Sequence, residues 1–163
     1  MLLVFSDQPK RKTDMENIIG GPFLQSAVFC EKALQEKDGV ISAIRIIDRF
    51  TISAGEGAPE LMPPMTVGMV LLIIFKSGDA SGKHELKIKP ISPSGKELAA
   101  FTFPFILAGG EHSANIIINY TLKAEEAGLY WFDVMLSDKS ITKMSMNLVY
   151  ERTQAISTTR PAH

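Results

Sequence analysis

The chain has little of what a catalytic or metal-binding site needs. Its 163 residues include one cysteine and three histidines. No histidine stands in the H-x-H or H-E-x-x-H spacing that holds zinc. There is no G-x-G-x-x-G or G-K-[ST] loop that would cradle a nucleotide phosphate. We therefore expect no cofactor, no metal site and no enzymatic activity.

Charge of one sign and long apolar runs are also missing. The chain has 17 basic and 18 acidic residues, and its formal net charge is −1. Nucleic-acid binding normally needs a basic face, and the one basic cluster, Lys10-Arg11-Lys12, lies in a segment without periodic patterning. The longest uncharged apolar run, 61–75, is shorter than the roughly 20 residues of a membrane span. We expect neither a nucleic-acid partner nor a membrane partner.

Two features of the N-terminal part favour a cytoplasmic protein. The apolar opening Met1–Phe5 lacks a preceding basic region and is shorter than the apolar core of a signal peptide. Cys30 has no cysteine to pair with, which fits a reducing compartment. Because Cys30 ends the apolar run 27–30, we expect a buried, inert thiol, and a reactive thiol is the alternative.

What the chain does have is apolar alternation with a period of two, the signature of half-buried strands. Turn residues separate the alternating runs, and no convincing long helix interrupts them. Turn-rich segments 76–82 and 108–111 are expected to end strands. The expected strands are 24–31 with a weaker continuation to 35, 40–52, 65–75, 84–91, 97–107, 114–122, 129–136 and 141–151.

This pattern predicts an all-β fold, an immunoglobulin-like antiparallel β-sandwich of seven or eight strands. The sandwich domain is expected to occupy residues 22–151. The segments on either side lack core periodicity, so we expect 1–21 to be flexible and 152–163 to be a disordered tail.

Some of the expected strands carry specific predictions about burial. Segment 65–75 is apolar on both alternating sets, as in a central strand that is covered on both faces. Pro104 falls on the polar side of 97–107, which indicates an edge strand or a bulge. In 40–52, the residues expected to share one face are Ile44, Ile46, Phe50 and Ile52. In 97–107, the residues expected to face the core are Phe101, Phe103, Phe105 and Leu107.

The stretch Glu126-x-Gly128-x-Tyr130-x-Phe132 resembles the Asp-x-Gly-x-Tyr-x-Cys stretch of immunoglobulin-like domains. Glutamate stands for the acid, and Phe132 occupies the place of the disulfide cysteine. The resemblance implies a tyrosine corner, in which the Tyr130 hydroxyl bonds to the backbone of the preceding loop. That role is structural.

A longer likeness runs from about Phe23 to Tyr150. It resembles a bacterial β-sandwich family of unknown function, although the chain has Glu31 where that family commonly has aspartate. The family implies the fold and supplies no activity. The residues that carry the likeness are Phe29-Cys30-Glu31, Asp38-Gly39, Ile44 to Ile52, Pro63-Pro64, Ser94-Gly95 and Gly128 to Val134.

Two hypotheses for function follow. The first is a non-enzymatic bacterial protein-binding or assembly module that uses loops or a strand edge to hold another protein or its own copy, as a homo-oligomer. The alternative is a small-ligand or carbohydrate-binding β-sandwich with an aromatic stacking platform. Packing over the end of the fold is the competing reading of the partner-contact segment. The candidate residues are Leu61, Met62, Pro63, Pro64 and Met65 for partner contact, and Trp131, Tyr120 and Tyr150 for stacking.

Overall fold

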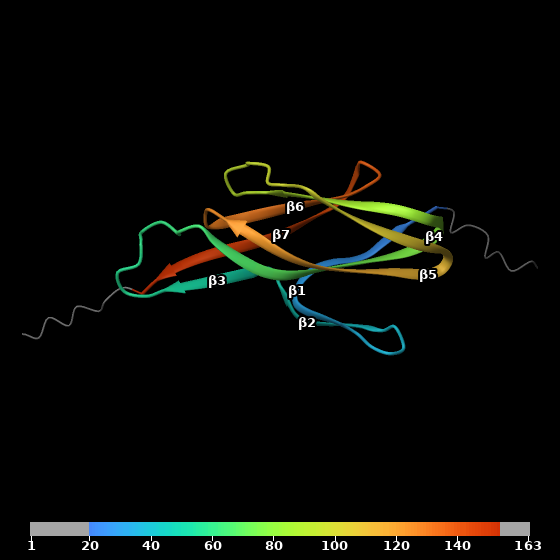
Figure 1. Cartoon of the computed structure of the whole chain (residues 1–163), viewed down its shortest axis with the longest axis horizontal. Coiled ribbons are helices and arrows are strands. Elements are labelled where there is room, and N and C mark those ends of the chain that lie inside the picture. Colours follow the sequence, from blue (N-terminus) through green and yellow to red (C-terminus); the bar gives the residue numbers. More distant parts are fainter. Residues whose placement is uncertain (1–19, 154–163) are drawn as a thin grey trace, which may run out of the picture.

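The computed structural model describes residues 20–153, which form seven strands in one continuous sheet (Figure 1). No helix occurs within these residues, so none is available there to span a membrane. The predicted all-β fold is confirmed. The expected flexible segment and disordered tail lie largely outside the described residues. The strands are β1 (Phe23–Gln35), β2 (Ile41–Ile47), β3 (Arg49–Ala54), β4 (Met65–Ile91), β5 (Phe101–Ala124), β6 (Gly128–Leu136) and β7 (Lys139–Arg152).

Strand β4 is the hub of the sheet. The strand order is β2-β1-β4-β6-β7-β3, and β5 also pairs with β4, outside this path. The first part of β4 bonds β1, and its last part bonds β6. Because the two ends of one strand have different neighbours, the sheet curls around its own interior. All pairs are antiparallel except β3 with β7, which is parallel and departs from the antiparallel expectation.

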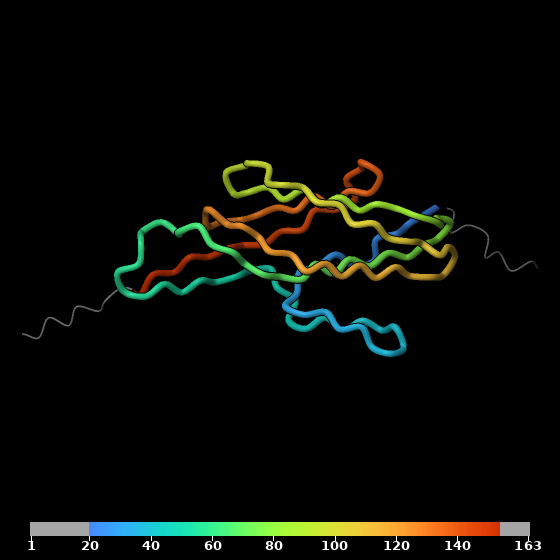
Figure 2. Tube along the Cα trace, viewed as in Figure 1, coloured from blue at the N-terminus to red at the C-terminus, as the bar shows by residue number. Residues whose placement is uncertain are grey.

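Strands β4 and β5 form one long ribbon that bends back on itself (Figures 1 and 2). The ribbon pairs from Met65 with Ala124 to Ile88 with Phe101, and its register shifts between Lys76 and Ser81. The prediction that strands end at 76–82 and at 108–111 is therefore wrong, because β4 and β5 continue through these segments. Each turn-like segment lies opposite the other, so the two strands bend together and the ladder resumes beyond the bend.

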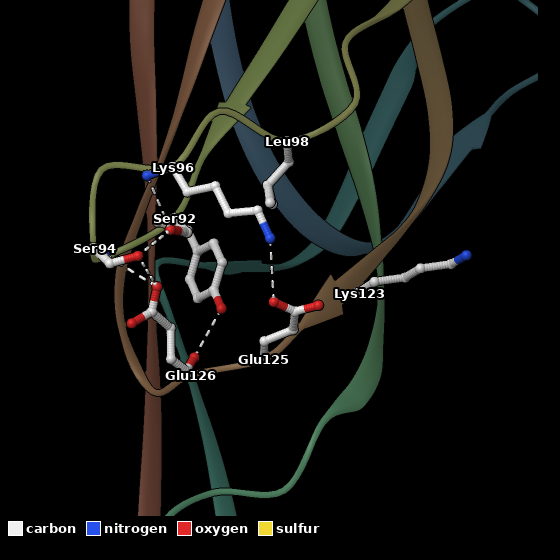
Figure 3. Close-up of a pocket in the computed structure, with 8 residues that line it drawn as sticks. Ser92, Ser94, Lys96, Leu98, Lys123, Glu125 and Glu126 are labelled. Carbon is white, nitrogen blue, oxygen red and sulfur yellow. Dashed lines mark hydrogen bonds and ion pairs between the residues drawn. The ribbon is translucent and has the colours of Figure 1, made fainter.

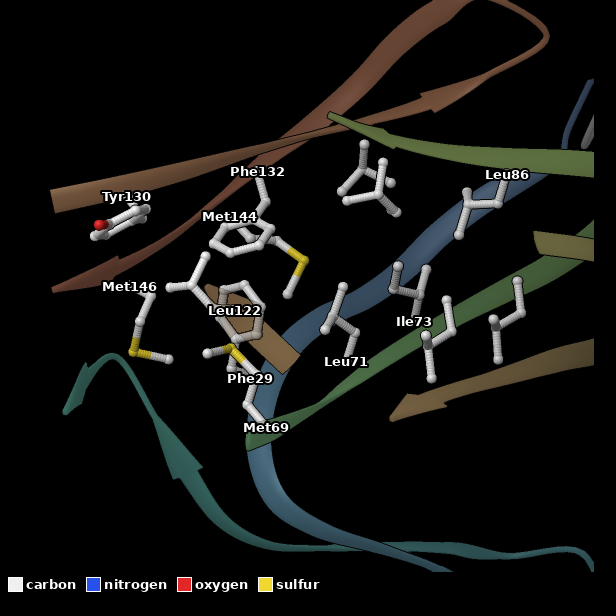
Figure 4. Packing of buried hydrophobic residues seen from close by; sticks show 14 of the residues in the cluster. Phe29, Met69, Leu71, Ile73, Leu86, Leu122, Tyr130, Phe132, Met144 and Met146 are labelled. Atoms are coloured by element: carbon white, nitrogen blue, oxygen red, sulfur yellow. The ribbon is translucent and has the colours of Figure 1, made fainter. Parts of the chain in front are cut away.

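The main core is enclosed by this bend and receives side chains from most strands (Figure 4). The rings of Phe29 in β1 and Phe132 in β6 meet edge to face, with centroids 4.8 Å apart. Phe75 stacks on Phe105 across the ribbon, at 5.4 Å. The predicted aromatic stripe of 97–107 does face the core, and its member Phe103 is only partly buried there. The largest fully buried side chains are Tyr130, Phe75, Phe132, Leu71, Ile73, Leu86, Ile88, Leu107, Ile116, Leu122, Met146 and Leu148.

Two further burial predictions are confirmed. Both alternating sets of 65–75 are mainly buried, because β4 has a core on each face. The second cluster, on the opposite face from Phe29, comprises Cys30, Val70 and Leu72. Cys30 is fully buried, and this burial raises the pKa of its thiol.

The expected single strand 40–52 is wrong. The chain divides there into β2 and β3, on either side of Asp48. The four residues expected to share one face are separated: Phe50 and Ile52 pack against the core, but Ile44 and Ile46 are exposed. The reason is local, because Arg45 has a φ of 52°, a left-handed conformation that interrupts the alternation of a strand.

The tyrosine corner is confirmed. Tyr130 is buried, and its hydroxyl donates a hydrogen bond of 2.8 Å to the carbonyl oxygen of Glu126. The Glu126 carboxylate in turn accepts bonds from the Ser94 hydroxyl, at 2.6 Å, and from the Ser94 backbone N–H, at 3.1 Å. These bonds lower the pKa of Glu126. The corner thus ties the β5–β6 turn to the connection between β4 and β5.

Truncation of two phenylalanines should separate the centre of the core from its margin. Phe132→Ala should lower the free energy of unfolding by about 3 to 5 kcal/mol, as loss of a large buried side chain does. Phe103→Ala should cost clearly less, because Phe103 is only partly buried. Chemical denaturation of both variants measures the difference, and equal losses would contradict the packing described above.

Removal of one oxygen tests the tyrosine corner. Tyr130→Phe keeps the ring and leaves the Glu126 carbonyl without its donor, so it should destabilise the protein by about 1 to 3 kcal/mol. Tyr150→Phe is the matched control, because the Tyr150 hydroxyl bonds the carbonyl oxygen of Pro59 on an exposed loop. Urea titrations of the two variants check this, and an undisturbed Tyr130→Phe midpoint would refute the structural role.

Candidate functional site

A groove of about 650 Å³ runs along one edge of β5. One wall consists of residues 118–121 together with Lys123, and the facing wall consists of residues 96–101. Successive side chains of a strand point to opposite faces. Because residues 118–121 all line the groove, both faces of the strand contribute to this wall. The wall is therefore the edge of β5, where the main chain is exposed between the side chains.

This edge of β5 has no strand partner among the described residues. β5 pairs with β4 on one side only, from Phe101 to Ala124. On the free side, alternate residues of an edge strand present backbone N–H and C=O groups that no ladder satisfies. The groove therefore offers a row of backbone donors and acceptors beside a second wall.

Two aromatic rings give the groove an apolar part. Phe101 and Tyr120 stack with centroids 4.9 Å apart and an interplanar angle of 20°. Tyr120 also meets Phe132 of the core edge to face, at 5.7 Å. Partial burial raises the pKa of the Tyr120 phenol. Ala99 and Ala100 carry small side chains on the facing wall, so the groove stays open above these rings.

Charged residues stand where the groove meets a smaller cavity of about 250 Å³ (Figure 3). Lys96 Nζ lies 3.4 Å from Glu125 Oε2, and this ion pair joins the two walls. Both side chains are mostly exposed, so the pair contributes little and can open at little cost. Lys123 also lines both cavities, and Figure 3 shows it directed away from this pair.

The three expected stacking residues are not brought together. Tyr120 lines the groove, but Phe101 covers one face of its ring. Trp131 lies on β6 outside the groove and is 41% exposed. Tyr150 lies on β7 and bonds the Pro59 carbonyl. A stacking role for these three residues stays a prediction.

The expected partner-contact segment is divided between surface and core. Leu61 is 82% exposed, whereas Met62 is buried in the main core. Pro63 and Pro64 are exposed, and Met65 begins β4 half-buried. Leu61 and the two prolines are thus free to touch a partner, and that role also stays a prediction.

Sequence reasoning missed the groove because it merged one wall into a strand. Residues 97–107 were expected to form a single strand, but β5 begins at Phe101, and Glu97 only bridges to Ile91. Pro104 correctly indicated an edge strand, but it lies in the other half of β5 and does not line the groove. Within residues 20–153, no three histidine, cysteine, aspartate or glutamate side chains gather closely enough to hold a metal ion.

Comparison with solved structures gives distant similarities. An immunoglobulin-like protein from Pseudomonas aeruginosa is 12% identical, covers 76% of this chain and 91% of its own length, and has a TM-score of 0.37. A β-glucosidase from Listeria innocua is 11% identical in two structures, one of them in complex with isofagomine. Their TM-scores are 0.38 and 0.41. They cover 66% and 90% of this chain, which corresponds to only 15% and 21% of the enzyme chains.

Comparison by sequence identifies a family. No curated protein matches the chain. The model of a family of unknown function, DUF6941, matches residues 25–149. This range falls within the likeness expected from about Phe23 to Tyr150, and the expected membership in a family of unknown function is confirmed. The chain belongs to the family DUF6941.

Proposed function

We propose that the protein is a non-enzymatic protein-binding module of bacterial type, and that it holds an extended segment of another protein in the groove along β5. One observation carries the proposal: a wall of the groove is an unpaired strand edge at residues 118–121. An extended peptide presents the complementary row of backbone groups and can add to such an edge as a further strand.

The facing wall favours a single peptide over the edge of another sheet. Residues 96–101 stand across the groove from β5. A neighbouring strand in a sheet lies about 4.8 Å away, so a peptide bonded to β5 would occupy the space between the walls. A whole sheet edge would bring further strands into the position of residues 96–101. The groove therefore suits one extended chain.

The side chains around the groove suggest what the peptide looks like. Tyr120 and Phe101 lie on the core side of β5, so peptide residues on that side should be apolar. Asn119, Thr121 and Lys123 belong to the outward set, where polar peptide residues fit. Lys123 forms no ion pair with the other described residues, which favours an acidic peptide residue beside it. The expected ligand alternates apolar and polar residues and carries an acid.

We also infer that the curled sheet is an immunoglobulin-like sandwich. In this arrangement, β2, β1, the first half of β4 and the second half of β5 form one layer, and the remaining halves with β6, β7 and β3 form the other. The edge-to-face contact of Phe29 with Phe132 supports this, because the two rings come from different layers. The tyrosine corner at Tyr130 also supports it.

A small-ligand or carbohydrate site is the second candidate function. It is favoured by Trp131 on β6, which is 41% exposed and lies two residues after the exposed Leu129. An exposed indole offers a stacking face to a sugar or another flat ligand. The emission of this single tryptophan reports such binding directly. A titration with soluble oligosaccharides that shifts the emission, with loss of the shift in a Leu129→Ala variant, would favour this function.

Selection from a displayed library of random linear peptides tests the peptide groove. Selected peptides should bind the full chain, and Ala100→Trp, which fills the groove, should weaken binding at least about tenfold, or 1.4 kcal/mol. The matched control is Ala108→Trp, an exposed alanine of β5 at the bend and outside the groove. Bound peptide should also slow amide exchange in residues 118–123.

Three results would contradict the groove as the binding site. These are a selection that yields no binders, equal binding by the two tryptophan variants, and unchanged exchange in residues 118–123. Circular dichroism melts of both variants establish that they are folded.

A further inference from the structure

The hairpin formed by β1 and β2 projects from the body of the protein (Figures 1 and 2). β2 is the last strand at its end of the sheet and pairs only with β1. Strand β2 has large apolar side chains that are exposed: Ile44 is 42% exposed and Ile46 is 64% exposed. Val40, just before the strand, is also exposed. An edge strand of this kind is a template for pairing with another chain.

A kink in the hairpin turns these isoleucines outward. Arg45, with its φ of 52°, lies between the register pairs of Ile44 with Lys32 and Ile46 with Cys30. Its guanidinium nitrogen Nη1 lies 3.1 Å from Glu31 Oε1 across the hairpin. A left-handed arginine within a strand is uncommon and costs energy. Ile44 and Ile46, on either side of the kink, remain exposed among the described residues.

The packing of the hairpin records the same kink. Before it, Cys30 of β1 belongs to the second cluster and Val28 packs against that cluster, and both are even-numbered. Beyond it, odd-numbered Ala33 of β1 packs against that cluster, as do Ile41 and Ala43 of β2. The side of the ribbon that faces the protein therefore changes at the kink. Ile41 and Ala43 attach the hairpin to the second cluster, whereas Ile44 and Ile46 are exposed.

The free sheet edges in the described part of the chain differ in how they are protected. β5 has Pro104 in its edge and the facing wall 96–101 beside it. β3 is only six residues long and begins with an arginine. Natural edge strands are usually blunted by lysine, proline, inward charge or short length. Residues 41–47 contain no proline, lysine or acid, and their one charge is paired with Glu31.

We propose that β2 pairs, edge to edge and antiparallel, with β2 of a second copy of this chain. A two-fold axis at the edge places a strand beside its own copy in the antiparallel direction, the arrangement of the commonest symmetric dimers. The exposed Ile44 and Ile46 of both copies then lie along the joined edge. Like-charge repulsion between the copies is small, because Arg45 is already neutralised within its own hairpin.

A second copy fits this edge better than a foreign strand. The exposed apolar pair is self-complementary, since isoleucine meets isoleucine across the axis. No charged side chain in 41–47 lacks a partner of opposite sign within its own protomer. The joined sheet leaves the β5 groove of each copy untouched, because β2 and β5 are different edges. The dimer is thus independent of peptide binding.

Sedimentation velocity of the full chain over a concentration series tests this interface. The wild-type chain should move from monomer toward dimer as concentration rises, and Ile46→Lys should stay monomeric at least tenfold beyond the wild-type midpoint. The matched control is Ile106→Lys, because Ile106 is an isoleucine of β5 that is 67% exposed. This control should dimerise like the wild type. Amides of 41–47 should exchange more slowly in concentrated than in dilute wild-type protein.

Several outcomes would overturn the proposal. One is a wild-type chain that stays monomeric up to hundreds of micromolar, and another is a dimer that Ile46→Lys leaves intact. Equal disruption by both lysine variants, or exchange in 41–47 that is independent of concentration, would place the contact elsewhere. If Ile46→Lys does not fold, Ile44→Lys and the exchange measurement on the wild type decide. Ala100→Trp should leave dimerisation unchanged, so failure of the groove and failure of the dimer are distinguishable.

Discussion

The bend in the β4–β5 ribbon is the constraint on which the rest of the structure depends. Gly78 sits at this bend with a φ of 57°, paired with Gly110, whose φ is 58°. A Cβ on Gly78 would collide with the carbonyl oxygen of Gly20. The same stretch is held by Asp79, whose Oδ2 accepts the Gly20 N–H at 2.8 Å and whose own N–H donates to Gly20 O at 2.9 Å.

From this bend the core and the groove both follow. Folding the ribbon back curls the sheet around the interior that holds the aromatic contacts of Phe29, Phe75 and Phe132. The fold of the ribbon also brings residues 118–121 of β5 close to residues 96–101, the segment that leads into the start of the same strand. Tyr130 and Glu126 then fasten that segment through Ser94. The groove is therefore bounded on one side by the ribbon edge and on the other by a segment that the tyrosine corner holds.

The sequence predicts the elements of this fold better than their connections. Period-two alternation identified most strand residues, and the Glu126-x-Gly128-x-Tyr130 stretch identified the corner, because both signals are local. The segments 76–82 and 108–111 predict turns that end strands, because glycine-rich segments have the same composition whether one strand ends or two strands bend together. The sequence does not predict the kink at Arg45, because arginine has no preference for a positive φ. The groove depends on the pairing of distant segments, which periodicity does not report.

A pair of alanine substitutions with the same backbone strain tests the bend directly. Gly78→Ala and Gly110→Ala both place a Cβ at a φ near 57°, which costs about 1 to 2 kcal/mol. Only Gly78→Ala adds a collision, with Gly20, because nothing lies within 4 Å of a Cβ on Gly110. Chemical denaturation should show a clearly larger loss of unfolding free energy for Gly78→Ala than for Gly110→Ala. Equal losses, or a Gly78→Ala variant as stable as the wild type, would contradict a bend held at Gly78.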